Sequence, residues 1–133
     1  MKKAYLSISY QNRKKLCAEI EAIRAVLAAN QIELFVFVDN YCFATTEEKQ
    51  MMQQAFADIA SADLLIAEAS EKAIGVGIEI GYAAALHKPI IYLRNMQSTH
   101  STTASGSADH SIIYQNPEDL AQKLKEMATT LQF

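Results

Sequence analysis

Hydrophobic and polar positions along this chain follow two periods in turn, one typical of strands and one typical of helices. Short apolar segments, several of them rich in β-branched and aromatic residues, predict five strands over residues 4–9, 33–38, 64–67, 89–93 and 111–114. Between them the apolar residues recur at spacings of three and four, which predicts helices over residues 13–30, 45–61 and 77–87 and a last helix opened by Asn116 and Pro117.

This alternation predicts an α/β fold: a single-domain, doubly wound sheet of the Rossmann-like or flavodoxin-like kind, with five mostly parallel strands. The pattern marks no internal repeat, and 133 residues are enough to bury one core, so residues 1–133 are expected to form one domain. Such folds bind ligands beyond the carboxyl ends of their strands. That rule selects four site-forming loops: residues 7–11, 39–44, 68–77 and 94–107.

One segment, residues 97–111, is rich in serine and threonine. This composition fits a flexible surface linker. It also fits a hydroxyl-rich lid or clamp for a polar ligand. The second interpretation is favoured because the segment follows a strand on the ligand side of the predicted sheet.

Composition and charge exclude several classes of protein. Hydrophobic residues make up 50% of the chain and charged residues 20%, which is ordinary for a globular domain. The formal net charge of -3 argues against a surface that binds nucleic acid. The apolar segments are too short for a membrane span or a signal peptide, so a cytoplasmic location without membrane attachment is expected. Histidines and cysteines show no metal-ligand spacing, and neither a metal nor a cofactor is predicted.

The most informative segment is 62–93, ADLLIAEASEKAIGVGIEIGYAAALHKPIIYL, which reads as a strand, a turn, a glycine-punctuated helix start and a strand. Glu79 lies between Gly77 and Gly81, and the pattern predicts it in the first turn of that helix. A carboxylate there would repel a phosphate, whereas the positive end of the helix favours its ionised form. Glu79 is therefore a nucleophile or sugar ligand, or else an acid that only complements the helix dipole.

This segment resembles the nucleoside 2-deoxyribosyltransferase superfamily, and most closely its 2'-deoxynucleoside 5'-phosphate N-hydrolase branch. In that family the glycine-flanked glutamate is the nucleophile, which corresponds to Glu79, and a tyrosine on the first strand corresponds to Tyr5. A first-loop hydroxyl near the phosphate corresponds to Ser9, and a late-loop serine that reaches the phosphate of the neighbouring subunit corresponds to Ser101. The resemblance therefore implies a homodimer that acts on a deoxyribonucleoside or deoxyribonucleotide.

The chain departs from the family pattern at the acid that orients the sugar and handles a proton. The family aspartate is replaced by Ala55. Asp58, one helical turn further on, or Asp39, at the end of the second predicted strand, could take its place and protonate the leaving nitrogen.

The phosphate-binding positions differ as well. The first-loop arginine of the hydrolase branch is replaced by Gln11, although Arg13 is close, and a phosphate-contacting serine is replaced by Ala73. Ser7 in the same loop is a further candidate substrate ligand. The sequence leaves open whether the substrate is a nucleoside or its 5'-monophosphate.

The chemistry that the resemblance implies is cleavage of an N-glycosidic bond. Glu79 would attack the anomeric carbon through an oxocarbenium-like transition state, and water or a second base would capture the covalent glycosyl-enzyme. Tyr5 would orient the carboxylate, while Gly75 and Gly77 would let the backbone approach the sugar closely. The choice between a hydrolase and a transferase stays open.

Other hypotheses compete with this one. A nucleotide-binding module that lost efficient chemistry is favoured by Ala55, whereas a dinucleotide-binding domain is discounted because the glycines follow the third strand, not the first. Structural roles are also possible for single residues: Tyr5 can fill the edge of the core, Asp39 can cap a turn, and Asp58 can be a solvated helix acid.

Overall fold

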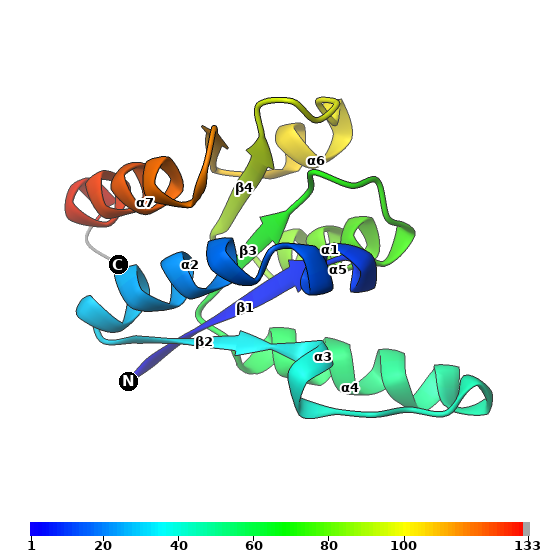
Figure 1. Cartoon of the computed structure of the whole chain (residues 1–133). Coiled ribbons are helices and arrows are strands. Elements are labelled where there is room, and N and C mark those ends of the chain that lie inside the picture. Colours follow the sequence, from blue (N-terminus) through cyan, green and yellow to red (C-terminus); the bar gives the residue numbers. More distant parts are fainter. Residues whose placement is uncertain (132–133) are drawn as a thin grey trace.

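The computed structural model describes residues 1–131 and shows a five-stranded sheet with helices on both faces (Figure 1). The strands are β1 Lys2–Ile8, β2 Ile32–Val36, β3 Leu64–Glu68, β4 Ile90–Asn95 and β5 His110–Tyr114. Their order in the sheet is β2-β1-β3-β4-β5, and all neighbouring pairs are parallel. The predicted doubly wound α/β fold is confirmed.

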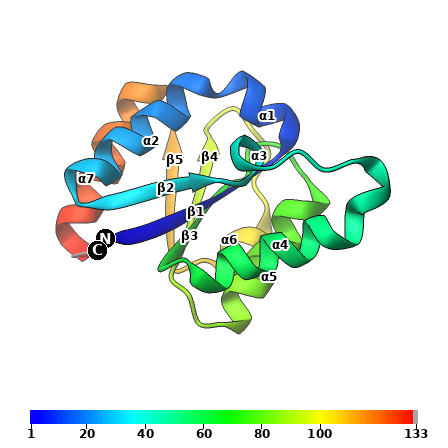
Figure 2. The ribbon, with the colours of Figure 1, turned by 90° about the horizontal axis from the view of Figure 1, so that it is seen from below.

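Two layers of helices cover the sheet. The helices are α1 Tyr10–Lys15, α2 Cys17–Ala29, α3 Phe37–Asn40, α4 Glu48–Ser61, α5 Ile74–Ala85, α6 Thr102–Ser107 and α7 Pro117–Leu131, and a 3-10 turn, Thr45–Glu47, precedes α4. Figure 2 shows α2 and α7 on one face and α4 and α5 on the other. No helix within residues 1–131 is long and apolar enough to cross a membrane.

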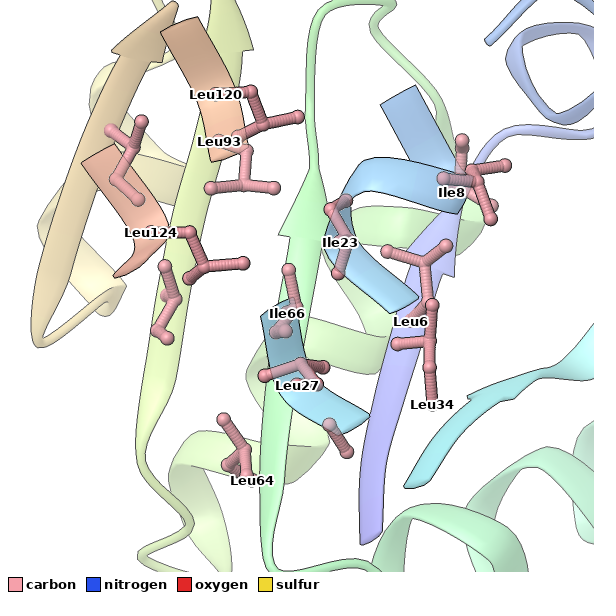
Figure 3. Close-up of a cluster of buried hydrophobic side chains, with 14 of the residues drawn as sticks. Leu6, Ile8, Ile23, Leu27, Leu34, Leu64, Ile66, Leu93, Leu120 and Leu124 are labelled. Atoms are coloured by element: carbon pink, nitrogen blue, oxygen red, sulfur yellow. The ribbon is translucent and has the colours of Figure 1, made fainter. Parts of the chain in front are cut away.

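The alternation of side chains along β1 divides the core into two parts. Ala4, Leu6 and Ile8 belong to the larger cluster, which packs against α2 and α7 (Figure 3). Tyr5, which lies between Ala4 and Leu6 in β1, belongs to the second cluster. This cluster lies under α4 and α5 and includes Ile59 of α4 and Ile80 of α5. Because Ser7 has the same parity as Tyr5, β1 directs a tyrosine and a serine toward α5.

The predicted helix over residues 13–30 is broken in the structure. Leu16 adopts φ −106° and ψ 37°, outside the helical region, and separates α1 from α2. The hydroxyl of Ser9 caps α1 by accepting a hydrogen bond from the amide of Asn12 at 3.1 Å. The first loop therefore folds into a helical turn that fixes Ser9 at the end of β1.

The start of α5 also differs from the sequence-based expectation. Helix α5 begins at Ile74, before Gly77, so Glu79 lies in its second turn and the first turn carries no acid. The serine- and threonine-rich segment is not a structureless linker, because it contains α6, and Ser101 caps that helix by accepting from the amide of Ala104 at 3.3 Å.

Candidate active site

The carboxylate of Glu79 is held by two hydroxyl groups of β1. The hydroxyl of Tyr5 donates to Oε2, and the hydroxyl of Ser7 donates to Oε1 at 2.6 Å. Tyr5 and Ser7 are fully buried, whereas Glu79 is partly buried. Both oxygens of one carboxylate are thus oriented from a neighbouring strand, which fixes the direction of the side chain.

The environment of Glu79 sets its ionisation by two opposing effects. Burial raises the pKa of Glu79 above its ordinary value, and the hydrogen bonds from Ser7 and Tyr5 lower it in part. Burial and the adjacent carboxylate raise the pKa of Tyr5, so its phenol stays a neutral donor. The expectation that the N-terminus of α5 stabilises the ionised carboxylate of Glu79 is wrong. The helix dipole acts within the first turn, and Glu79 lies in the second.

Glu79 lies at the wall of a cleft of about 420 Å³, here called the Glu79 cleft. Residues of α3 and α4, namely Phe37, Val38, Met51, Met52 and Ala55, form an apolar part of its lining. The remaining lining residues come from β1, the first loop and the start of α5: Tyr5, Leu6, Ile8, Ser9, Tyr10, Ala73, Gly75, Val76 and Glu79. Glu79 is the single charged residue in this lining, and the ion pairs found among residues 1–131 do not include it.

Aromatic rings support the outer wall of this cleft. The ring centroid of Phe37 lies 4.9 Å from that of Tyr41 and 6.1 Å from that of Phe43, and the Phe37 and Phe43 rings are nearly parallel. These spacings are typical of aromatic pairs that attract each other. Phe37 is therefore backed by two further rings.

A second hollow, of about 520 Å³, lies on the other side of the start of α5 and is here called the Ser101 hollow. Its polar lining consists of Glu71, Lys72 and four hydroxyl residues of the late loop and α6: Ser101, Thr102, Thr103 and Ser107. Gly77 also lines this hollow and not the Glu79 cleft. Ala73 and Val76 line both, so the two hollows adjoin across the first turn of α5.

The structure thus divides the candidate substrate-binding residues between two places. Ser9 and Gly75 line the Glu79 cleft, and Ser7 contacts the carboxylate. Gly77 and Ser101 lie in the Ser101 hollow. Gln11 is exposed on α1 and lines neither, so the structure does not bring it to the carboxylate.

Neither acid considered for the missing aspartate lines the cleft. Asp39 is exposed and accepts two hydrogen bonds from the guanidinium of Arg13, at 2.8 and 2.9 Å, which turns its carboxylate toward α1. Asp58 accepts from Gln54 at 3.2 Å, and its Oδ2 is buried without a partner. Burial and Glu79 raise the pKa of Tyr5, and the negative charge of Asp58 adds a smaller effect in the same direction.

Glu68, at the end of β3, is a buried carboxylate that hydrogen bonds to several elements of the fold. Its oxygens accept from the hydroxyl of Tyr114 at 2.6 Å, the hydroxyl of Ser70 at 2.8 Å and the side-chain amide of Asn12 at 3.5 Å. Ser70 also accepts from the amide of Asn95 at 2.8 Å. These bonds tie β3, β4, β5 and α1 together at the carboxyl ends of the strands and supply the buried carboxylate of Glu68 with hydrogen-bond donors.

Sequence reasoning also missed the apolar wall of the cleft. Met51, Met52 and Ala55 share one face of α4, and their spacing of three and four would have shown it. Phe37 was expected inside a strand, whereas β2 ends at Val36 and Phe37 begins α3. Among residues 1–131, no group of three or more His, Cys, Asp or Glu is placed to hold a metal ion.

Several solved structures are similar to this chain over most of its length. The chain is similar to the CMP N-glycosidase of Clostridium botulinum, with 24% identity, a TM-score of 0.66, and coverage of 92% of this chain and 98% of that one. It is similar to a 2-deoxyribosyltransferase of Bacillus psychrosaccharolyticus (17% identity, TM-score 0.69, 90% of each chain) and to one of Leishmania mexicana (17% identity, TM-score 0.62, 95% and 98%).

At these identities the solved structures establish a shared fold. A search of curated proteins gave no match. The family evidence comes from the sequence model named Nucleoside 2-deoxyribosyltransferase, which matches residues 4–127 and includes both Tyr5 and Glu79. Since that match spans nearly the whole length, the chain belongs to the nucleoside 2-deoxyribosyltransferase family.

Proposed function

We propose that this protein cleaves the N-glycosidic bond of 2'-deoxyribonucleosides or their 5'-monophosphates, with Glu79 as the nucleophile. The observation that carries the proposal is the carboxylate of Glu79, held at both oxygens by Tyr5 and Ser7 at the wall of a cleft. A nucleophile needs a fixed direction and access to the substrate, and this carboxylate has both.

The reaction proceeds in two displacements at the anomeric carbon C1'. One oxygen of Glu79 bonds to C1' while the bond from C1' to the base nitrogen breaks, through an oxocarbenium-like transition state. Water then releases the sugar, or a second base captures it. Tyr5 and Ser7 donate hydrogen bonds to the carboxylate throughout and keep it aimed at C1'.

The place of a 5'-phosphate is the Ser101 hollow rather than the cleft. The hollow presents Lys72, beside Glu71, and four hydroxyl side chains that can donate hydrogen bonds to a phosphate, whereas the cleft lining contains no lysine or arginine. We assign this hollow to the phosphate of a nucleotide bound in the cleft of a second subunit. The protein then acts as a homodimer in which each subunit completes the site of the other.

The decisive experiment measures base release by chromatography from 2'-deoxynucleosides, their 5'-monophosphates and CMP, with and without a second free base. CMP belongs in the panel because the similar protein of Clostridium botulinum is a CMP N-glycosidase. Release in water alone identifies a hydrolase, and exchange that requires a free base identifies a transferase. Release that persists unchanged in Glu79→Gln would remove Glu79 as the nucleophile.

A second candidate function is a nucleotide-binding module without efficient chemistry. It is favoured by Ala55, which is 2% exposed and lines the cleft where an acid would be expected. This candidate predicts saturable binding of nucleotides, seen by calorimetry, without base release from any compound of the panel.

A further inference from the structure

We propose that the Glu79 cleft takes N-glycosides whose leaving base carries a delocalised positive charge, a pyridinium ring above all. The inference narrows the substrate of the activity proposed above, and therefore rests on that activity. Three features of the cleft support it: the charge balance around Glu79, the chemistry of the apolar wall, and the groups available to the departing base.

The first feature is a carboxylate without a counter-charge. Its two partners, Tyr5 and Ser7, are neutral hydroxyl groups, and Glu79 is the single charged residue in the cleft lining. A partly buried anion is normally paired with a cation, because burial weakens its solvation. A cationic ring in the cleft supplies the missing positive charge. It also favours the ionised carboxylate, which burial alone disfavours.

The second feature is a wall that suits a flat cation. Phe37 contributes an aromatic ring, backed by Tyr41 and Phe43, and Met51 and Met52 contribute thioethers. Aromatic faces attract cations, and the polarisable sulfur of methionine packs well against aromatic rings. Tyr10 is less suited, since the ammonium of Lys14 already lies 4.4 Å from its ring centroid.

The third feature concerns the departing base. A neutral base leaves as an anion unless an acid protonates it, and such help is typically worth about 10²–10⁴-fold. Ala55 lines the cleft where the family has an aspartate, and the carboxylates of Asp39 and Asp58 lie outside the lining. A cationic base needs no proton, so this cleft is matched to it.

The bonds and charges balance without a further reactant. As the C1'–N bond breaks, its electron pair moves to the ring nitrogen and neutralises the pyridinium, while an oxygen of Glu79 bonds to C1'. Water then adds to C1' as the bond to Glu79 breaks. The electron pair of that bond returns to the carboxylate, and one proton passes to the solvent. The products are a neutral base and the free sugar.

The main test compares nicotinamide 2'-deoxyriboside with 2'-deoxycytidine as substrates of the wild-type protein, Ala55→Asp and Glu79→Gln. The Glu79→Gln rate is subtracted as the blank. We expect the wild-type protein to release nicotinamide faster than cytosine by about 10²-fold or more. We expect Ala55→Asp to lower that ratio by about tenfold or more, because the restored acid can protonate the departing cytosine, whereas nicotinamide needs no proton.

Each other outcome has a defined meaning. Equal release of both bases by wild type, or equal acceleration of both by Ala55→Asp, overturns the cationic preference and leaves the glycosidase intact. No release of any base above the Glu79→Gln blank overturns the glycosidase, and this inference with it. The two failures are therefore distinguishable.

A binding measurement covers the case in which Ala55→Asp does not fold. The probes are 1-methylnicotinamide, a cation, and 3-methylbenzamide, its neutral carbon isostere. We expect wild type to bind the cation more tightly than the isostere by about tenfold or more, a difference of roughly 1.4 kcal/mol, and Glu79→Gln to lose that difference. Equal affinities in wild type would overturn the inference.

Discussion

The hydroxyl of Ser7 donates to Oε1 of Glu79 at 2.6 Å across 72 positions of the chain, from the interior strand β1 to the helix α5. The bond opposes the effect of burial, because it stabilises the charged carboxylate. It therefore links the geometry of the site to the pH range in which the carboxylate is ionised.

Removing that bond is expected to move the pH dependence of activity. The nucleophile must be ionised, so activity is present above the pKa of Glu79 and is lost as the pH falls through it. Ser7→Ala removes a bond that lowers this pKa, and the acid limb of the kcat/KM profile then moves to higher pH. Base release measured from pH 4 to 9 checks the shift. A limb that stays in place while Tm is unchanged contradicts the role of Ser7.

Glu79→Gln is expected to abolish base release and to stabilise the fold at neutral and higher pH. Because burial raises the pKa of Glu79 in the folded state above its ordinary value of 4.5, the protonated form favours folding. That contribution is complete below the unfolded pKa and is lost as the pH rises through the folded pKa. The amide has no such loss. Thermal unfolding should give a higher Tm for the variant at pH 8 and nearly equal values at pH 4.

Gly75→Ala is expected to raise stability and to weaken substrate binding. Gly75 lies within α5, where alanine is worth roughly 0.5–1 kcal/mol more than glycine, and an added Cβ meets no atom within 4 Å. Since Gly75 lines the cleft, that Cβ occupies substrate space. Gly81→Ala, in the same helix but outside the cleft lining, is the matched control. With a substrate that carries no phosphate, only Gly75→Ala should raise KM.

Tyr114→Phe is expected to lower the free energy of unfolding by about 1.5–3 kcal/mol, because it removes a hydrogen bond to the buried carboxylate of Glu68. Denaturant unfolding measures the loss. Tyr114 lines neither the Glu79 cleft nor the Ser101 hollow, so kcat with a saturating nucleoside should stay near the wild-type value. A selective loss of kcat with unchanged stability would show that the network serves the chemistry instead.

Ser101→Ala is expected to weaken the binding of monophosphates more than the binding of nucleosides, because Ser101 lies in the hollow assigned to the phosphate. The KM ratio of the two substrate forms measures the effect, and equal changes in both would remove Ser101 from phosphate binding. Mixing Ser101→Ala with Glu79→Gln protein tests the partner. In a homodimer with shared sites, mixed dimers contain one site with both native residues, so monophosphate activity recovers above that of either variant alone.

The fold class could be predicted from sequence because local patterns encode it. Segments such as 33–38 and 64–67 are apolar and β-rich, and the intervening spacing is helical, so the alternation and the parallel sheet follow. The ends of the helices were less predictable, because tertiary contacts between distant residues decide where a helix begins and ends. Leu16 breaks a segment whose spacing is helical throughout, and α5 begins at Ile74, before the Gly77 at which the pattern predicts its start.

The sequence by itself determined the α/β alternation, the family and Glu79 as the outstanding acid, because these depend on local spacing and on a contiguous motif. Only the tertiary structure decided what surrounds that acid. It paired Asp39 with Arg13, divided Gly77 and Ser101 from the Glu79 cleft, and brought Phe37 and the methionines of α4 to its wall. Charge balance and ionisation arise from groups far apart in the chain, whose distances only the packing of α4 and α5 on the sheet determines.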